Sequence, residues 1–174
     1  MALLHLRSAA AATPLKRRAV QAITTLPGVR GWLETLALGL AFCAVALPLG
    51  LWGGVLRLEP APTAALPLLL RTFFVPGVAE ELVFRVLPPP RFAAAALVAY
   101  ILVHPLNALL FLPSARDVFY NPVFLLLAAL LGGSCALLYR RTRSLWPPVA
   151  LHWLVVAGWL LLLGGERALR TGTV

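Results

Sequence analysis

Apolar runs of about the length needed to cross a membrane repeat along the chain and are separated by prolines and arginines. The pattern predicts about five spanning helices, at residues 31–56, 66–87, 92–112, 121–139 and 146–163. The expected fold is therefore an all-α, polytopic membrane helix bundle formed by residues 31–165. A basic N-terminal tail, 1–30, precedes it, and a short C-terminal tail, 166–174, follows it.

Composition agrees with a membrane protein, because 61% of the residues are hydrophobic and the mean hydropathy is +0.90. The net charge of +9 comes from basic residues at the ends of the apolar runs, without the interleaved aromatic residues that suit a nucleic-acid site. We therefore expect membrane lipid, and not nucleic acid, as a partner.

Basic residues also predict the orientation of the chain. Ten lie on the side of the N-terminus and five on the other, which indicates a multi-pass integral membrane protein with a cytoplasmic N-terminus. The tail itself contains five basic residues and no acidic residue. That composition also fits an amphipathic surface helix or an organelle transit peptide, so the sequence leaves the role of the tail open.

Within the second apolar run, the stretch PGVAEELVFR at 76–85 carries three charged side chains. A charged side chain at the centre of a membrane helix costs roughly 2.5–3.5 kcal/mol on insertion scales, so it is expected to have a function. On a helix Glu81 and Arg85 face each other, whereas Glu80 points about 100° away. We assign Glu81 and Arg85 to the architecture and the unpaired Glu80 to acid–base chemistry. The alternative is one structural ion network between helices.

Two histidines, His104 and His152, lie inside the third and fifth predicted spans. Counted at about 1.5 Å per residue, they and Glu80 lie in the cytoplasmic half of the membrane or near its midplane. Polar groups at one depth turn toward one another, and a carboxylate with two imidazoles can activate water. Each histidine alone also fits a packing role. Asn107, on the same face as His104, either completes the site or forms an ordinary interhelical hydrogen bond.

Three segments in this order, EELVFR at 80–85, YILVH at 100–104 and SLWPPVALHW at 144–153, resemble the motifs of the CAAX protease and bacteriocin-processing (Abi) family of intramembrane proteases. The resemblance covers the second to the fifth predicted span. It implies that Glu80 and His104 activate the attacking water and that His152 helps to hold the tetrahedral oxyanion. Better understood members of that family resemble glutamate-type proteases that work without metal.

The chain departs from the family pattern at two positions. Tyr100 stands where the second motif usually begins with Phe, and Val156 stands where the last motif, HxxxN, has Asn. An amide donor in an oxyanion hole is worth about 2.7–4 kcal/mol of transition-state stabilisation. Another donor such as Asn107 replaces it, or the enzyme is slow, or the protein has lost proteolysis.

The resemblance implies an intramembrane endopeptidase that hydrolyses a peptide or membrane-protein substrate near the cytoplasmic face. Two alternatives remain: an inactive scaffold or chaperone of the same fold, and a small transporter in which Glu80 and the histidines relay protons. The chain shows no evident inverted repeat, which disfavours the transporter. No cofactor is expected. Zinc could bind two imidazoles and a carboxylate, but the sequence has no HExxH segment to favour a metal site.

Overall fold

The computed structural model describes residues 14–172, and every regular element in this range is a helix. The α-helices are α1 (Pro14–Thr24), α2 (Val29–Trp52), α3 (Ala65–Thr72), α4 (Ala93–Leu110), α5 (Arg116–Phe119), α6 (Pro122–Thr142), α7 (Trp146–Leu162) and α8 (Gly165–Thr171). Two π-helical stretches, η1 (Phe73–Glu80) and η2 (Leu82–Val86), follow α3, and 3₁₀ turns stand at η3 (Pro90–Phe92) and η4 (Pro113–Ala115). The predicted all-α fold is confirmed.

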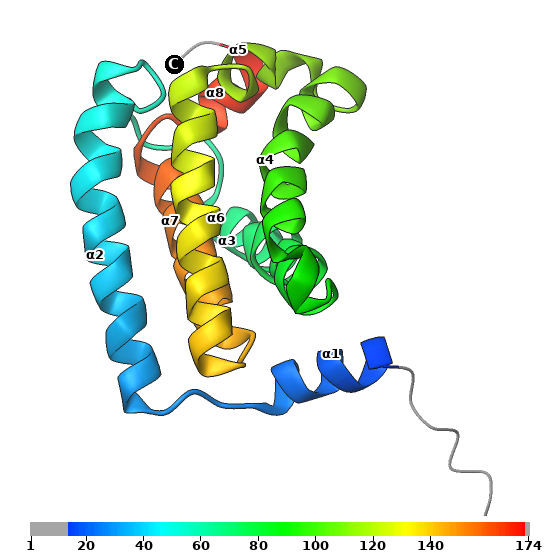
Figure 1. The fold of residues 1–174 in the computed structure, drawn as a ribbon. Coiled ribbons are helices and arrows are strands. Elements are labelled where there is room, and N and C mark those ends of the chain that lie inside the picture. Colours follow the sequence, from blue (N-terminus) through cyan, green and yellow to red (C-terminus); the bar gives the residue numbers. More distant parts are fainter. Residues whose placement is uncertain (1–13, 173–174) are drawn as a thin grey trace, which may run out of the picture.

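Helix α6 lies in the middle of the bundle, where it packs against α2, α4 and α7 (Figure 1). Helix α1 lies across one end of the bundle, beside the end of α6, and α5 and α8 lie at the other end (Figure 1). Part of the predicted N-terminal tail is therefore a helix in contact with the bundle. Residues 1–13 of that tail lie outside the described residues.

The outer surface of the bundle is apolar. Helix α2, the segment Pro90–Leu110 and α6 are each long and apolar enough to cross a membrane, and α7 is a shorter apolar helix. Large side chains such as Leu40, Leu102 and Leu126 are exposed to 63%, 58% and 48%. Apolar patches of this extent are rare on soluble proteins. Together with the apolar helices, they identify an integral membrane protein.

Polar residues close both ends of α6 near the predicted boundaries. At the start of α6 the Asn121 side chain accepts a hydrogen bond from the Val123 amide (2.8 Å), and Pro122 occupies the first turn, where its missing donor costs least. The helix ends at Arg143, whose φ of 55° is left-handed, with Arg140 and Arg141 in its last turn. Cations there complement the negative end of the helix dipole.

The second predicted span, 66–87, is helical up to Val86, but only its first part is an α-helix. From Phe73 to Val86 the hydrogen bonding is mainly of the wider π type, and Pro76 lies inside η1. Proline has no amide hydrogen to donate, so a helix that contains it must rearrange locally. Because π-helical turns often occur at functional sites, this segment is a candidate position for one.

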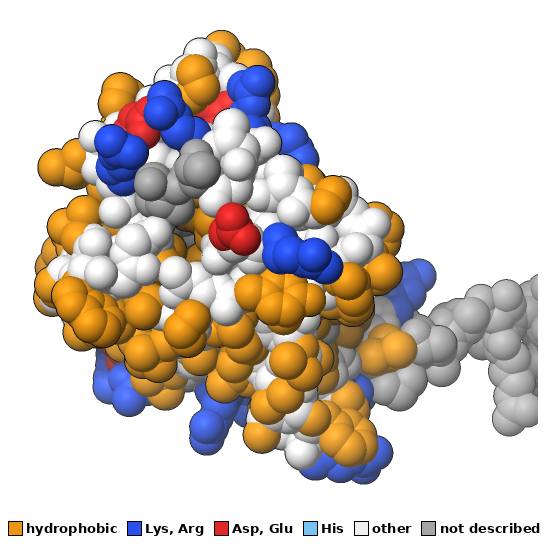
Figure 2. Space-filling view, turned by 90° about the horizontal axis from the view of Figure 1, so that it is seen from above, with side chains coloured by type: hydrophobic (Ala, Val, Ile, Leu, Met, Phe, Trp, Pro, Cys, Tyr) orange, Lys and Arg blue, Asp and Glu red, His pale blue; other side chains and the backbone are white. Residues whose placement is uncertain are grey.

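The predicted C-terminal tail contributes to the packed end of the bundle. Its residues up to Thr171 form α8, where Glu166 accepts hydrogen bonds from the Thr63 amide (3.3 Å) and hydroxyl (2.8 Å). Glu59 forms an ion pair with Arg167. Figure 2, seen from this end, shows carboxylates next to cationic side chains and hydrophobic side chains over the flanks. At this end, acidic and basic side chains therefore largely offset one another.

Candidate active site

Glu81 lies at the junction of η1 and η2, and its carboxylate is fully buried with two partners. Its Oε2 lies 3.4 Å from Arg85 Nε, so the ion pair predicted from the four-residue spacing is confirmed. Its Oε1 lies 2.7 Å from Nδ1 of His152 on α7, a contact that the sequence did not predict. A carboxylate only accepts hydrogen bonds, so the imidazole donates through Nδ1. Glu81 thus joins two helical segments.

The neighbouring Glu80 has a more open environment. Its side chain is 23% exposed, against 0% for Glu81, and its closest ionic neighbour is His152 Nε2 at 4.0 Å. The Oε2 atom of Glu80 is itself buried and forms no hydrogen bond among the described residues. A buried acceptor without a partner is uncommon and requires an explanation. Glu81 Oε2 likewise forms no hydrogen bond within residues 14–172, but it lies beside Arg85 in a fully buried side chain, so Glu80 is the carboxylate of this cluster that an incoming group can reach.

Tyr100 on α4 connects the other groups. Its ring is 1% exposed, and its hydroxyl lies 3.4 Å from His152 Nε2. The Arg85 guanidinium lies 4.6 Å from the centre of the ring, in cation–π geometry. A Cβ atom at Gly132 of α6 would approach the Tyr100 ring to 2.8 Å, so the absence of a side chain there makes room for the tyrosine.

His104 lies one turn beyond Tyr100 on α4. Its Nδ1 is 3.0 Å from the Tyr100 carbonyl oxygen, to which it donates, and this bond leaves Nε2 as an acceptor. Its ring packs edge-on against Tyr100, Phe119 and Phe124 at centroid distances of 5.3, 5.5 and 5.3 Å. His104 therefore adjoins the cluster through the tyrosine ring and does not itself pair with Glu80.

The structure thus brings Glu80, Glu81, Arg85 and His152 together and places His104 beside them. The side chain of Asn107, which was predicted on the face of His104, forms no hydrogen bond in the described part of the chain. The group that sequence reasoning undervalued is Tyr100. Its substitution for Phe in the second motif was the available signal, but only the fold shows that the added hydroxyl lies next to His152.

Within residues 14–172 no group of three or more His, Cys, Asp or Glu side chains could hold a metal ion. His152 uses Nδ1 for Glu81 and has Nε2 near Tyr100 and Glu80, and His104 uses Nδ1 for a backbone carbonyl. The side chains that surround Glu80 can donate or accept hydrogen bonds, and one of them is a guanidinium. This arrangement suits the transfer of a proton from a water molecule and the binding of a developing negative charge.

Comparison with known proteins identifies the family. Residues 62–158, more than half of the chain, match the family model described as Rce1-like, type II CAAX prenyl endopeptidase. This range contains all three sequence motifs and every member of the cluster around Glu81. Comparisons with curated proteins and with solved structures gave no match. The matched range and the motifs within it show that the chain belongs to the Rce1-like family of type II CAAX prenyl endopeptidases.

Proposed function

We propose that this protein is an intramembrane endopeptidase that hydrolyses a peptide bond in a prenylated, CAAX-type substrate, with Glu80 as the general base. The observation that supports this assignment most directly is the difference between the two adjacent carboxylates. Glu81 is fully buried, accepts a hydrogen bond from His152 Nδ1 at 2.7 Å and pairs with Arg85, whereas the Glu80 side chain is 23% exposed and lies 4.0 Å from His152, with its buried Oε2 free of hydrogen bonds among the described residues. A general base must have a free acceptor within reach of the proton it removes.

In the proposed reaction the Glu80 carboxylate takes a proton from water while the water oxygen bonds to the scissile carbonyl carbon. The neutral acceptor Nε2 of His104 holds the same water. The tetrahedral intermediate collapses as the carbon–nitrogen bond breaks, and Glu80 returns the proton to the leaving amine. General acid–base catalysis of this kind contributes about 10²- to 10⁴-fold to the rate.

The oxyanion of the intermediate needs a donor, which we assign to the edge of the cluster formed by Tyr100 and His152. The Tyr100 hydroxyl and His152 Nε2 lie 3.4 Å apart, so both can point at one oxygen atom. Glu81 accepts from Nδ1 of His152 and so fixes the direction of Nε2, which donates only when the ring carries both protons as imidazolium; with the neutral ring the Tyr100 hydroxyl is the donor. Donors held in place before the reaction stabilise negative charge without reorganising, which makes such an arrangement effective.

The distribution of charge supports a multi-pass protein with the α1 end in the cytoplasm. The described basic residues at that end outnumber its single acidic residue, Glu34; they are Lys16, Arg17, Arg18, Arg30, Arg91, Arg140, Arg141 and Arg143. At the α8 end four basic residues stand beside three acidic ones: Arg57, Arg116, Arg167 and Arg170 with Glu59, Asp117 and Glu166. An excess of basic residues is typical of cytoplasmic segments.

The test is peptide cleavage by the purified protein in detergent. The substrates are a prenylated peptide with a C-terminal CAAX sequence and the same peptide without the prenyl group. We expect cleavage of the prenylated peptide and a loss of about 10²-fold or more in kcat for Glu80→Gln. Glu34→Gln, at the surface end of the bundle, is the control and should retain activity.

Full activity of Glu80→Gln would contradict the role of this carboxylate. Cleavage of both peptides at equal rates would contradict the prenylated substrate. Absence of cleavage by the folded wild-type protein would favour the inactive scaffold, to which the replacement of the usual Asn by Val156 also points.

A further inference from the structure

Helix α1 is attached to the end of the bundle by specific contacts. Ala22 is 1% exposed and packs in a cluster with Val86, Leu145 and Val149. Its carbonyl accepts a hydrogen bond from the Leu145 amide (2.9 Å), and the Ile23 carbonyl accepts one from Trp146 Nε1 (2.8 Å). These bonds hold α1 across the bundle, where it follows the plane of the membrane surface if α2 and α6 span the bilayer (Figure 1).

The side of α1 that faces away from the bundle is both apolar and basic. Leu15, Val20 and Ile23 are exposed to 50%, 52% and 42%, and Leu26 just after the helix to 78%. The same helix carries Lys16, Arg17 and Arg18 and no acidic residue. Helices with this composition lie in the interface of anionic membranes, with the apolar side chains at the acyl boundary and the cations among the headgroups.

A small cavity lies between α1 and the end of α6. It has a volume of about 170 Å³ and is lined by Arg18, Gln21, Ala22, Tyr139 and Arg143, with no carboxylate among them. Arg18 is oriented by a hydrogen bond from Nη1 to the Leu87 carbonyl (3.0 Å). Arg143 is the left-handed residue that ends α6. Two guanidinium groups, an amide and a phenol form the donor set that phosphate oxygens prefer.

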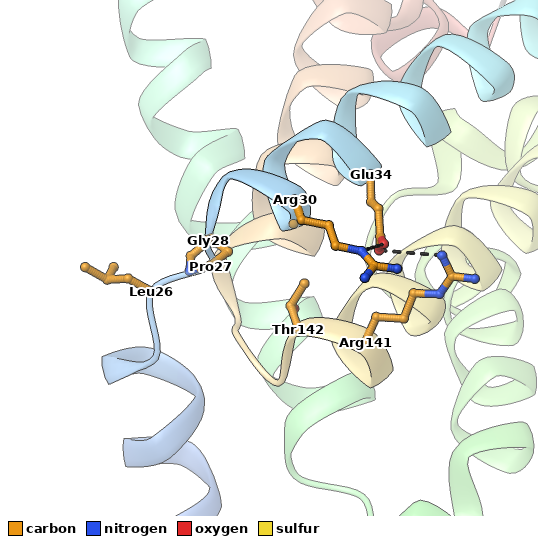
Figure 3. A pocket seen from close by; sticks show the side chains of 8 residues that line it. Leu26, Pro27, Gly28, Arg30, Glu34, Arg141 and Thr142 are labelled. Atoms are coloured by element: carbon orange, nitrogen blue, oxygen red, sulfur yellow. Dashed lines mark hydrogen bonds and ion pairs between the residues drawn. The ribbon is translucent and has the colours of Figure 1, made fainter.

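A second, larger cavity nearby provides the contrast. It has a volume of about 630 Å³ and also contains two arginines, Arg30 and Arg141 (Figure 3). Both arginines contact the carboxylate of Glu34, at 3.1 Å and 3.5 Å, as the dashed lines in Figure 3 show. An incoming anion would have to compete with Glu34 there. In the cavity of Arg18 and Arg143 it meets no such competitor.

We propose that the cavity of Arg18 and Arg143 binds the phosphate group of an anionic phospholipid, while the apolar side chains of α1 enter the acyl boundary of the same leaflet. The lipid would then fix α1 to the membrane surface. The carbonyls of Ala22 and Ile23 accept hydrogen bonds from the start of α7, the helix that carries His152. The bound lipid would therefore also stabilise this end of α7.

The experiment measures lipid binding by the full-length protein in a neutral detergent. Phosphatidylglycerol, phosphatidylcholine and inorganic phosphate are titrated separately, with melting temperature and tryptophan quenching by a brominated lipid as readouts. We expect saturable binding of phosphatidylglycerol, and weakening by about tenfold or more in Arg18→Gln/Arg143→Gln. The matched control is Arg17→Gln/Arg140→Gln, which removes the same charge from the same two helices but touches neither cavity.

The single variant Arg143→Gln guards against a folding defect, because its side chain forms no hydrogen bond to another described residue. It should also weaken binding while leaving the melting temperature without lipid unchanged. Equal weakening in the control pair would indicate unspecific attraction to the basic end and would overturn the proposal. Equal binding of phosphatidylcholine, or binding of inorganic phosphate but not of lipid, would overturn it as well.

Discussion

The polar cluster inside the bundle has two halves that differ in how their charges are satisfied. In the paired half, Glu81 is fully buried between Arg85 (3.4 Å) and His152 (2.7 Å). In the open half, Glu80 is 23% exposed and 4.0 Å from His152, and His104 donates only to a backbone carbonyl. The two carboxylates are adjacent in the sequence, yet they project from different sides of one helical segment into different surroundings.

This difference indicates how one cluster can combine rigidity with reactivity. Removing charges from water is expensive, and a buried ion is tolerated when partners surround it. In the paired half the Glu81 carboxylate lies between Arg85 and His152, although Glu81 Oε2 and Arg85 Nε and Nη2 form no hydrogen bond in the described part of the chain, and these contacts fix the relative position of η2 and α7. The open half then has the freedom to exchange its partners for water and substrate. We expect substitutions in the paired half to act on stability and those in the open half to act on turnover.

The largest expected effect therefore belongs to the paired half. Glu81→Ala leaves Arg85 and His152 without their shared acceptor, and Arg85→Ala leaves the Glu81 charge with one partner fewer. Breaking a buried pair on one side typically costs about 3–5 kcal/mol. Unfolding of the purified variants in detergent should show this loss of stability for Glu81→Ala and Arg85→Ala, and a much smaller loss of stability for Glu80→Ala. If all three variants unfold alike, the two halves do not differ in the way described.

The next-largest effect is expected at Tyr100, which lies between the two halves. Tyr100→Phe removes the hydroxyl beside His152 Nε2 but keeps the ring under Arg85. Loss of one oxyanion donor lowers kcat by about 10²-fold or more, and KM should stay the same. Steady-state cleavage of the prenylated peptide measures both constants. A large rise in KM, or a loss of folded protein, would mean that the hydroxyl acts on binding or on packing.

A smaller change in the opposite direction is expected from Val156→Asn. The residue lies one turn beyond His152 on α7, so an amide there projects from the same face of the helix. We expect a rise in kcat of about tenfold or less in the wild type, because Tyr100 already supplies a donor. In the Tyr100→Phe background the same substitution should restore more. A gain that is identical in both backgrounds would show that the two positions act independently.

Sequence reasoning located the elements well because the apolar runs end at residues with strong local preferences. The fourth predicted span, 121–139, corresponds to α6 at Pro122–Thr142, which Asn121 and Pro122 begin and Arg143 ends. The Glu81–Arg85 contact was likewise set by spacing on one helix. Such local signals do not depend on how the helices pack against one another.

Contacts between helices were harder to predict. Spacing shows which residues share a face, but not how far each helix is rotated toward its neighbours. The π-helical turns of η1 and η2 change that rotation, and His152 meets Glu81 more closely than it meets Glu80. For the same reason the role of Tyr100, and the packing of Glu166 against Thr63 in a predicted tail, became visible only in the fold.

The smallest expected effect is that of metal removal, which should leave cleavage unchanged. A zinc mechanism would need His104 and His152 as ligands together with a carboxylate. In the structure His152 is held by the paired half through Nδ1, and His104 uses its Nδ1 for the Tyr100 carbonyl. If Glu80 activates water directly, incubation with a strong chelator should alter kcat by less than about twofold, whereas a zinc peptidase treated in parallel loses activity. Elemental analysis of the purified protein complements the kinetics. If activity vanishes on chelation and returns with added zinc, and the protein holds one equivalent of metal, then zinc and not Glu80 activates the water directly. The two halves would in that case form one metal site.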